Sequence, residues 1–380
     1  MNILLVVTGL PDNDNLARSV FNLNYALELA NLGHNVNIIY LRALKPNRPL
    51  VKERKLNELK VFEVGCVIPI KYGKMLNFIS HTIFRLSLIK KNLVSIFEET
   101  DVIHCINGNG AIYAKRLAKE YNKPYIVQFV GSDVNFDLSV NLLSAPYKSA
   151  LAKARYLTFN SLRLKIDFCQ KCKINTPTQV IYRGVKLCDF EYQLSPIKSE
   201  VKLLFLGGFP NMGNLKGGLT LLEALSRLDD RIDNEFSLVV SVGGPNSERN
   251  NFRKYFKNIS IDYMGAKTRE EVKVMMKESH IVVIPSLNEG LPNVLYEAMA
   301  SGNLLICSQV GGIPEFIKHG KTGFLFPADD SEGLVVLLER VLNNPQIIQE
   351  LAAAARNMIE KYDYVKFINA YLDIFEEIKD

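Results

Sequence analysis

Residues 281–308, IVVIPSLNEGLPNVLYEAMASGNLLICS, contain one complete strand–helix–strand unit. Apolar residues fill Ile281–Pro285 and Leu304–Ser308, which predicts two strands buried on both faces. Between them, Pro292 suits the first helical position, where its missing N–H costs nothing, and Gly302 suits the helix end. The pattern therefore predicts a parallel β-α-β unit with a polar loop before its helix.

The same alternation continues outward in both directions. Apolar runs predict strands in the first half at 2–8, 35–41, 101–106, 124–130, 156–160 and 179–182, with helices at 15–32 and 111–121. In the second half they predict strands at 202–207, 237–242, 259–264 and 323–326, helices at 217–228, 248–257 and 268–278, and a helical tail from 331. A polar segment at 189–200 separates the halves. We predict an α/β fold of two Rossmann-like doubly wound domains, 1–192 and 198–362, facing across a cleft.

Composition excludes several classes of protein. The 380 residues are 48% hydrophobic and 23% charged, typical of a globular chain. No apolar stretch is long enough to span a membrane, and the N-terminal sequence lacks a basic signal region, so we expect a cytoplasmic protein. No nucleic-acid-binding motif is present, and we expect no nucleic-acid partner. Cys169 and Cys172 lack further ligands at zinc spacing, and Asp12 and Asp14 suit a helix cap, so we expect no metal.

The net charge of +6 is unevenly distributed. The window Lys45–Lys91 holds eleven basic and three acidic residues. Such a window favours an anionic partner, either phosphate groups or an anionic membrane at its inner face, although solvated loops explain it equally well. Within it begins Tyr72–Phe97, an apolar segment with basic residues. This segment is either a helix lying on a membrane surface or a helix buried in the first domain.

The loop and helix after Pro285 carry two carboxylates. Glu289 lies at the mouth of the predicted helix and Glu297 lies in its second turn. Backbone N–H groups at a helix start attract anions, above all phosphate. The carboxylates could bond the hydroxyls of a sugar and a ribose, or Glu289 could complement the helix dipole while Glu297 is simply solvated. The segment expected to line the site is Gly290, Leu291, Pro292, Asn293 and Val294.

Glu289 and Glu297 within NEGLPNVLYEAMASG resemble the signature of family 4 retaining glycosyltransferases with the GT-B fold. Val310–Glu315, Gly320–Phe326 and Lys216-Gly217 fall in the order typical of that family. The resemblance covers most of the second half and is thinner in the first. It implies a metal-independent hexosyltransferase that needs no cofactor. It also implies that the last helix, 363–380, packs back on the first domain.

In this family a nucleotide-sugar donor, here a UDP- or GDP-sugar, is held mainly by the second domain. The resemblance places Glu297 on the ribose hydroxyls, Glu289 on the donor sugar and Lys216 on the diphosphate. The backbone near Gly265 and Lys267 would meet the base. The acceptor would be a glycan or a lipid-linked glycan of surface-polysaccharide assembly. The expected chemistry is front-face attack with retention, in which the leaving phosphate helps to accept the acceptor proton.

Two residues of the first domain have two interpretations each. His104, expected at a strand end facing the cleft, either acts on the acceptor or fills the core. Asp133 either contacts the acceptor or caps a turn.

Three positions depart from the family pattern. Gly208 stands where the family has an Arg, Val130 stands where it often has a His, and the loop from Gly9 has one Gly instead of two. A non-catalytic sugar-nucleotide-binding subunit is therefore the alternative function. A sugar-nucleotide epimerase fits less well, because a histidine-rich site is absent from the sequence.

Overall fold

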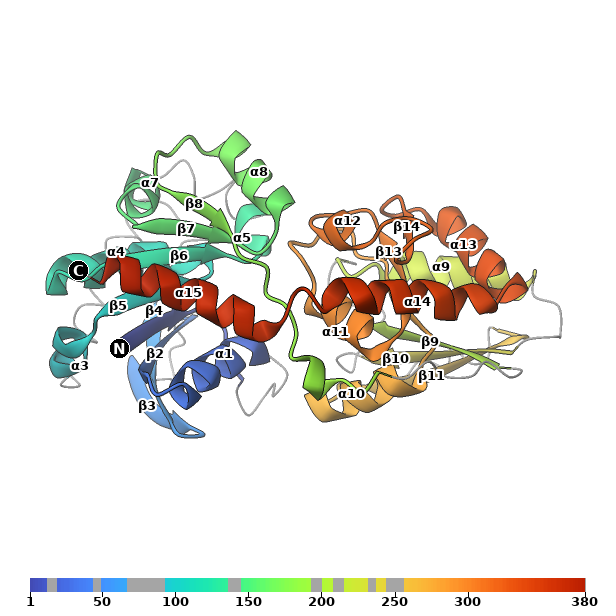
Figure 1. Ribbon diagram of the computed structural model, residues 1–380, viewed down its shortest axis with the longest axis horizontal. Coiled ribbons are helices and arrows are strands. Elements are labelled where there is room, and N and C mark those ends of the chain that lie inside the picture. The colour runs from blue at the N-terminus through green and yellow to red at the C-terminus, as the bar shows by residue number, and fades with distance from the viewer. Residues whose placement is uncertain are drawn as a thin grey trace. The chain divides into compact units, whose positions relative to one another are not determined.

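The computed structural model describes residues 1–11, 19–43, 49–66, 93–135, 145–192, 200–207, 215–231, 237–243 and 256–379. The chain divides into two compact units: unit 1 comprises Met1–Tyr182 and Ile368–Asp380, and unit 2 comprises Arg183–Phe367 (Figure 1).

The first division between the units falls at 182/183, not at the polar segment after residue 192. Residues 183–192 belong to unit 2 because Val185 forms a parallel bridge with Asp363. The N–H of Val185 donates to Tyr362 O at 3.1 Å, and the N–H of Tyr364 donates to Val185 O at 3.2 Å. The second division falls at 367/368, within the last helix.

Unit 1 contains an eight-stranded sheet in the order β3-β4-β2-β1-β5-β6-β7-β8. All neighbours are parallel except β3 and β4. The strands are β1 (Asn2–Val7), β2 (Asn35–Ala43), β3 (Val51–Leu56), β4 (Leu59–Cys66), β5 (Val102–Ile106), β6 (Tyr125–Phe129), β7 (Tyr156–Phe159) and β8 (Thr178–Val180). The β3–β4 hairpin is an addition to the predicted elements.

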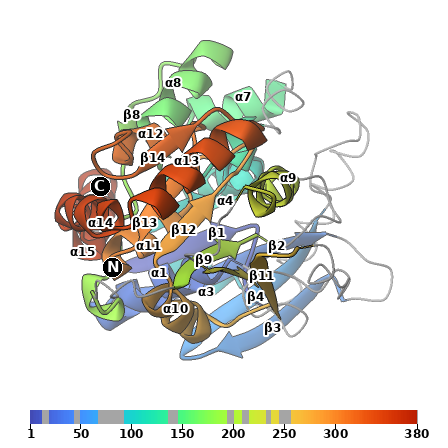
Figure 2. The same ribbon diagram turned by 90° about the vertical axis from the view of Figure 1, so that its right-hand side faces the viewer.

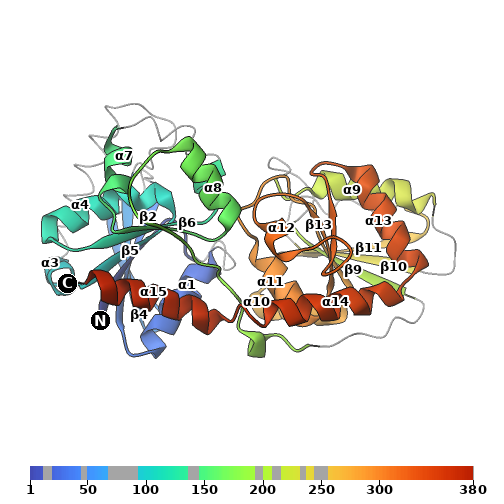
Figure 3. The same ribbon diagram turned by 45° about the horizontal axis from the view of Figure 1, so that its top comes forward.

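Helices cover both faces of this sheet (Figure 3). They are α1 (Val20–Asn31), α3 (Val94–Glu99), α4 (Ala111–Tyr121), α5 (Ser132–Asn135), α7 (Ala145–Ala152), α8 (Leu162–Lys171), the 3-10 turn η1 (Gly108–Gly110) and the part of α15 (Tyr364–Ile378) from Ile368. Side chains of α4, α7 and α8 join one apolar cluster with alternate strand residues such as Val127 and Phe129. On the opposite face, Tyr371 of α15 lies against Tyr25 of α1.

Unit 2 contains a six-stranded parallel sheet in the order β11-β10-β9-β12-β13-β14 (Figure 2). The strands are β9 (Glu200–Leu206), β10 (Ser237–Gly243), β11 (Ile259–Gly265), β12 (Ile281–Ile284), β13 (Leu304–Ser308) and β14 (Phe324–Phe326). In chain order this is 3-2-1-4-5-6, the doubly wound order in which ligands bind where the winding reverses. Here the reversal lies between β9 and β12.

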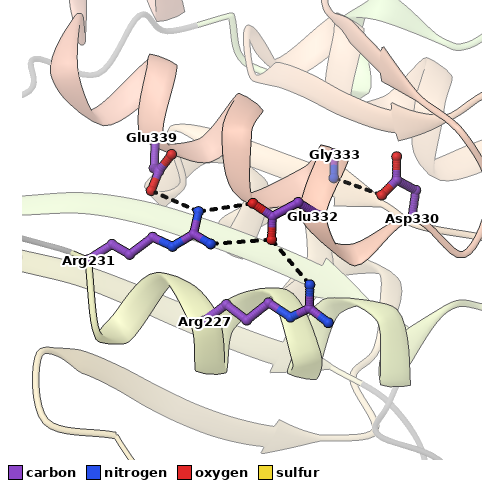
Figure 4. A network of polar contacts seen from close by, with 6 residues as sticks. All are labelled: Arg227, Arg231, Asp330, Glu332, Gly333 and Glu339. Carbon is purple, nitrogen blue, oxygen red and sulfur yellow. Dashed lines mark hydrogen bonds and ion pairs between the residues drawn. The ribbon is translucent and has the colours of Figure 1, made fainter.

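The helices of unit 2 are α9 (Gly218–Asp229), α10 (Arg269–Glu278), α11 (Asn293–Ser301), α12 (Ile313–Phe316), α13 (Ser331–Asn343), α14 (Gln346–Ile359) and the 3-10 turn η2 (Leu187–Asp189). Apolar residues of α9 and α13 share one core cluster with the sheet. On the solvent side of this contact, Arg227 of α9 binds Glu332 of α13 at 3.1 Å, and Arg231, just after α9, binds it at 3.0 Å (Figure 4). These pairs are exposed and screened by salt, so the apolar cluster is the main attachment of α9 to α13.

Some sequence predictions fall on residues outside the described ranges. These are Asp12–Asp14, Gly208, most of the helix at 248–257, most of the basic window Lys45–Lys91, and residues 72–92 of the apolar segment. In the described part of the chain, no helix is both long and apolar enough to cross a membrane.

Candidate active site

The loops that follow β9 and β12 meet at the reversal point of unit 2. The N–H of Leu287 donates to Leu215 O at 2.9 Å. Gly217 has φ +71°, and a Cβ there would lie 1.7 Å from Pro285 O. Only glycine allows this approach, because a side chain would collide with rigid backbone. The contact brings the neighbouring Lys216 to the loop that precedes α11.

Lys216 and Glu289 form an ion pair at this place. Nζ of Lys216 contacts Oε1 of Glu289, which also accepts a hydrogen bond of 3.2 Å from Ser286 Oγ. The Lys216 side chain is 55% exposed, whereas that of Glu289 is 14% exposed. The cation is therefore accessible to an anionic ligand, while the carboxylate is held from two sides. The sequence predicted both residues for the site, and the structure brings them together.

The start of α11 faces the same loops. Pro292 is its N-cap residue, so the helix begins at Asn293, one residue later than predicted. The Pro292 side chain cannot cap the first-turn N–H groups. Gly290 O accepts a hydrogen bond of 2.6 Å from the N–H of Gly312. At Gly311, φ is +52° and a Cβ would lie 2.1 Å from Glu289 O. The loop after β13 thus holds the segment 289–290 in place before the helix.

Glu297 lies in the second turn of α11 and is half-buried. Burial raises the pKa of the Glu297 carboxyl above its ordinary value. The positive charges of Arg269, Lys273 and Arg183 oppose this rise in the Glu297 pKa. A partly buried carboxylate with basic residues around it is suited to accept hydrogen bonds from ligand hydroxyl groups.

The basic residues around Glu297 are fixed by further contacts. Arg269 Nη2 lies 3.2 Å and Lys273 Nζ lies 3.9 Å from Asp189 Oδ2. Arg183 Nη1 donates to Asn293 Oδ1 at 2.8 Å. These four charged residues were not among the predicted site residues. Arg269 and Lys273 are four residues apart on a predicted helix, so the sequence predicts that they share one face of that helix. It does not predict that this face lies near Glu297 of α11.

Gly265 and Lys267 lie at the end of β11, and β10 separates that strand from β9. Gly265 has φ +69°. Lys267 Nζ pairs with Glu271 Oε1 at 3.0 Å, beside the capping box formed by Thr268 and Glu271. The structure therefore places these two residues two strands from the reversal point, at the same carboxyl edge of the sheet. Their predicted contact with a base stays a prediction.

His104 occupies a different place from the one predicted. It lies in the middle of β5, not at a strand end, and its side chain is fully buried. Its Nδ1 lies 3.1 Å from Tyr25 Oη, and its ring packs 4.6 Å from the Tyr371 ring. Burial lowers the His104 pKa to about 3. The prediction of a cleft-facing catalytic histidine is wrong, because α1 and α15 cover this face of the sheet, and His104 is a core residue.

Asp133 is also fully buried. Its carboxylate accepts hydrogen bonds from the backbone N–H groups of Gly108 at 2.9 Å, Gly131 at 2.9 Å and Val130 at 3.1 Å. Of the two interpretations of Asp133, the structure supports the turn-capping one. Asp133 fixes the loops after β5 and β6, and these loops lie at the carboxyl edge of the unit 1 sheet.

Within the described residues, no group of three or more His, Cys, Asp or Glu side chains could hold a metal ion. Cys172 is buried, whereas Cys169 and Cys188 are exposed, and none of the three forms a disulfide in the described structure. The predicted independence from metal and cofactor stays a prediction.

Two family models match the chain. Residues 193–359 match the model of glycosyl transferases group 1, and residues 14–161 match that of glycosyl transferase 4-like proteins. An uncharacterized glycosyltransferase of Methanocaldococcus jannaschii is 22% identical over 90% of both chains. A Campylobacter jejuni protein is 24% identical over 57% of this chain and 63% of its own. It is the α-1,4-N-acetyl-D-galactosaminyltransferase that acts on GalNAc-α-(1→4)-GalNAc-α-(1→3)-diNAcBac-PP-undecaprenol.

The solved structure of Anabaena HepE in complex with UDP has a TM-score of 0.70 to this chain. It is 16% identical and covers 99% of this chain and 100% of its own. This similarity extends over two α/β units with parallel sheets and shows the GT-B type of fold. Because the two family models match successive parts of one chain, each on its own α/β unit, the chain belongs to the group 1, family 4-like glycosyltransferases.

Proposed function

We propose that this glycosyltransferase moves a sugar from a nucleotide-sugar donor to a glycan or lipid-linked acceptor, with retention of anomeric configuration. The single observation that carries the proposal is the meeting of Lys216, Glu289 and the start of α11 at the reversal point of unit 2. A cation and helix N–H groups suit a diphosphate. Carboxylates beside them suit the hydroxyl groups of a sugar and a ribose.

The chemistry of transfer explains this combination of charges. Breaking the glycosidic bond develops positive charge at the anomeric carbon and negative charge on the departing diphosphate. Lys216 and the first-turn N–H groups of α11 would stabilise that diphosphate. Donors that are already held in place need little reorganisation as the negative charge develops. Removing one such donor typically raises the barrier by about 3 kcal/mol. Glu289 would orient the donor sugar, and Glu297 would accept hydrogen bonds from the ribose.

The nucleotide is proposed as UDP or GDP. The UDP complex of HepE, which shares this fold, supports UDP. The proposed acceptor class rests on the Campylobacter transferase, whose name specifies an undecaprenyl-diphosphate-linked glycan. A role in surface-polysaccharide assembly and peripheral contact with a membrane belong to the same proposal. Retention would proceed by front-face attack, with the leaving phosphate accepting the acceptor proton, and would require neither a metal nor another cofactor.

A donor panel tests the transfer. The full chain is mixed with UDP- and GDP-sugars, and release of nucleoside diphosphate is followed together with calorimetric binding. Slow release from one donor is the expected result. Binding without release would instead support the non-catalytic subunit, and an altered sugar without release would support an epimerase. Unchanged release in EDTA is expected, and the anomeric configuration of a product, read by NMR, tests retention.

Two pairs of variants test the site residues. Glu289→Gln should lower turnover by well over tenfold, whereas Glu360→Gln, at the exposed C-cap of α14, should not. Lys216→Ala should weaken binding of the free nucleoside diphosphate, whereas Lys202→Ala, 45% exposed on β9, should leave it unchanged. Equal turnover in Glu289→Gln would remove that residue from the mechanism. Equal affinity in Lys216→Ala would count against its contact with phosphate.

A further inference from the structure

A hollow of about 530 Å³ lies in unit 1 beside α7 and the segment that leads into β8. Its lining includes Lys148, Ser149, Lys173, Asn175 and Thr176. The chain enters β7 and β8 here, so the hollow lies at the amino ends of these strands. The loops held by Asp133 follow the carboxyl ends of β5 and β6, at the other edge of the parallel sheet. Within unit 1, the hollow therefore lies at the opposite edge of the sheet from the loops that Asp133 holds.

The segment that lines this hollow is strongly basic, and two of its lysines, Lys148 and Lys173, line the hollow itself. Residues 145–177 hold seven basic residues and one acidic residue, a net charge of +6. The acidic residue, Asp167, pairs with Arg163 at 3.0 Å. Among the described residues, no carboxylate lies within ion-pair distance of Lys148 or Lys173. An anionic partner would supply the missing opposite charge.

The neighbouring helix α4 adds to the same cluster. Lys115 Nζ donates to Ser149 Oγ at 2.8 Å, which places α4 beside α7. Burial lowers the pKa of Lys115 below its usual value, and the charges of Lys153 and Lys119 lower it further. The neighbouring lysines lower the Lys115 pKa because like charges repel one another, and a bound anion would reduce this repulsion.

An apolar stripe runs beside the basic cluster. Leu162, Ile166 and Cys169 follow i, i+4, i+7 spacing on α8 and are all exposed, Leu162 by 48% and Ile166 by 42%. The charge of Lys148 acts on Cys172 just after the helix, so the end of α8 lies close to the hollow. Figures 1 and 3 show α7 and α8 near the β8 edge of the sheet. Apolar side chains flanked by lysines are typical of surfaces that lie on a membrane.

The opposite edge of the same sheet, at β3, has no comparable excess of positive charge among its described residues. Residues 51–66, the β3–β4 hairpin, hold four basic and three acidic residues. Glu63 pairs there with Arg54 at 2.7 Å and with Arg42 at 3.6 Å. The described part of the basic window Lys45–Lys91 is thus close to neutral. The charge complementarity of the described residues favours the β8 edge.

We propose that α7, α8 and the segment 173–177 form a face that docks on an anionic phospholipid surface. The phosphate of one headgroup lies in the hollow between Lys148 and Lys173, and Leu162 and Ile166 enter the boundary between headgroups and acyl chains. Lysines near an anionic leaflet and apolar side chains at its boundary both favour this state. The docking is independent of which sugar is transferred.

Vesicle sedimentation with the full chain tests the docking. We expect salt-sensitive binding to phosphatidylcholine vesicles that contain phosphatidylglycerol, and little binding to phosphatidylcholine alone. Lys148→Glu/Lys173→Glu should lower the partition coefficient by at least about tenfold. Lys52→Glu/Lys55→Glu makes the same charge change on exposed residues of β3 and should leave it within about twofold. Leu162→Ser/Ile166→Ser should weaken binding even at low salt.

Unchanged thermal unfolding of these variants would show that the fold is intact. Donor hydrolysis equal to that of the wild type would show that the transferase site is intact. The vesicle test can be read even if the donor panel shows no hydrolysis. Equal binding to both kinds of vesicle would overturn the proposal. So would a Lys148→Glu/Lys173→Glu variant that binds like the wild type, or a loss caused only by Lys52→Glu/Lys55→Glu. Calorimetric binding of inorganic phosphate or glycerol 3-phosphate without vesicle binding would assign the hollow to a soluble phosphate compound instead.

Discussion

Replacing His104 should remove a large part of the acid sensitivity of unit 1. The His104 side chain is fully buried between α1 and α15, with Tyr25 Oη 3.1 Å from Nδ1 and the Tyr371 ring 4.6 Å away. Burial lowers its pKa to about 3, because the charged imidazolium would lose its hydration there. In the unfolded chain the same group has a pKa of about 6.5.

The sign of the effect follows from these two values. Above pH ~6.5 His104 is neutral in both states, and its contribution to stability is fully present. As the pH falls below this value, the unfolded chain binds a proton that the folded chain does not, so folding becomes less favourable. Each pH unit between about 6.5 and 3 lowers the free energy of unfolding by about 1.4 kcal/mol. At pH ~5 the loss is about 2 kcal/mol, a large share of the stability of a typical domain.

Urea unfolding near pH 7.5 and pH 5 measures this loss, with hydrogen exchange of β5 amides to report on unit 1. The wild type should lose about 2 kcal/mol more than His104→Gln or His104→Phe between the two pH values. His319→Gln, at an exposed residue of unit 2, serves as the matched control and should behave like the wild type. An equal acid loss in the His104 variants, or an NMR titration of His104 near pH 6.5, would refute its assignment to the core.

Three further substitutions test the remaining positions. Asp133→Asn removes the charge that accepts three backbone N–H groups and should lower the free energy of unfolding by about 2–4 kcal/mol in urea; unchanged stability with a raised KM for the acceptor would support the acceptor role instead. Gly217→Ala, whose Cβ would lie 1.7 Å from Pro285 O, should abolish calorimetric binding of nucleoside diphosphate, and normal affinity would contradict the close approach. Ser286→Ala, which frees one side of the Glu289 carboxylate, should lower kcat several-fold without raising KM, and Ser286→Thr should recover activity; a change in KM alone would contradict this positioning role.

The central elements of both sheets could be predicted from the sequence because each residue pattern indicates either a buried strand or an amphipathic helix, and not both. The helix predicted at 111–121 is α4, and the strand predicted at Leu304–Ser308 is β13. Buried parallel strands read as continuous apolar runs, and the helices between them carry periodic apolar residues. Edges were harder. In the β3–β4 hairpin, the edge strand β3 carries four successive charged residues, 52–55, and this sequence resembles a charged loop.

The error at His104 has a different cause. A strand pattern shows that a residue lies in a sheet but not which helix covers its face. The helix over His104 comes from the C-terminal end of the chain, and its contact through Tyr371 and Phe375 is long-range. The residues near Glu297 were missed for the same reason, because Arg183 and Asp189 come from the segment 183–192 and Arg269 comes from α10, both outside the helix that carries Glu297. Such contacts depend on helix rotation, which local sequence does not specify.

The neighbouring position of the loops that carry Lys216 and Glu289, by contrast, follows from topology. These two residues are 73 residues apart in the sequence, and no local pattern links them. A doubly wound order places the first and fourth strands of a unit side by side, and the loops after both strands then leave from the same edge in opposite directions. Lys216 follows the first strand of unit 2 and Glu289 follows the fourth, so any chain with this winding brings the two loops together. The order of strands therefore predicts that the two loops meet, whereas the Lys216–Glu289 ion pair and the surroundings of Glu297 require the packed structure.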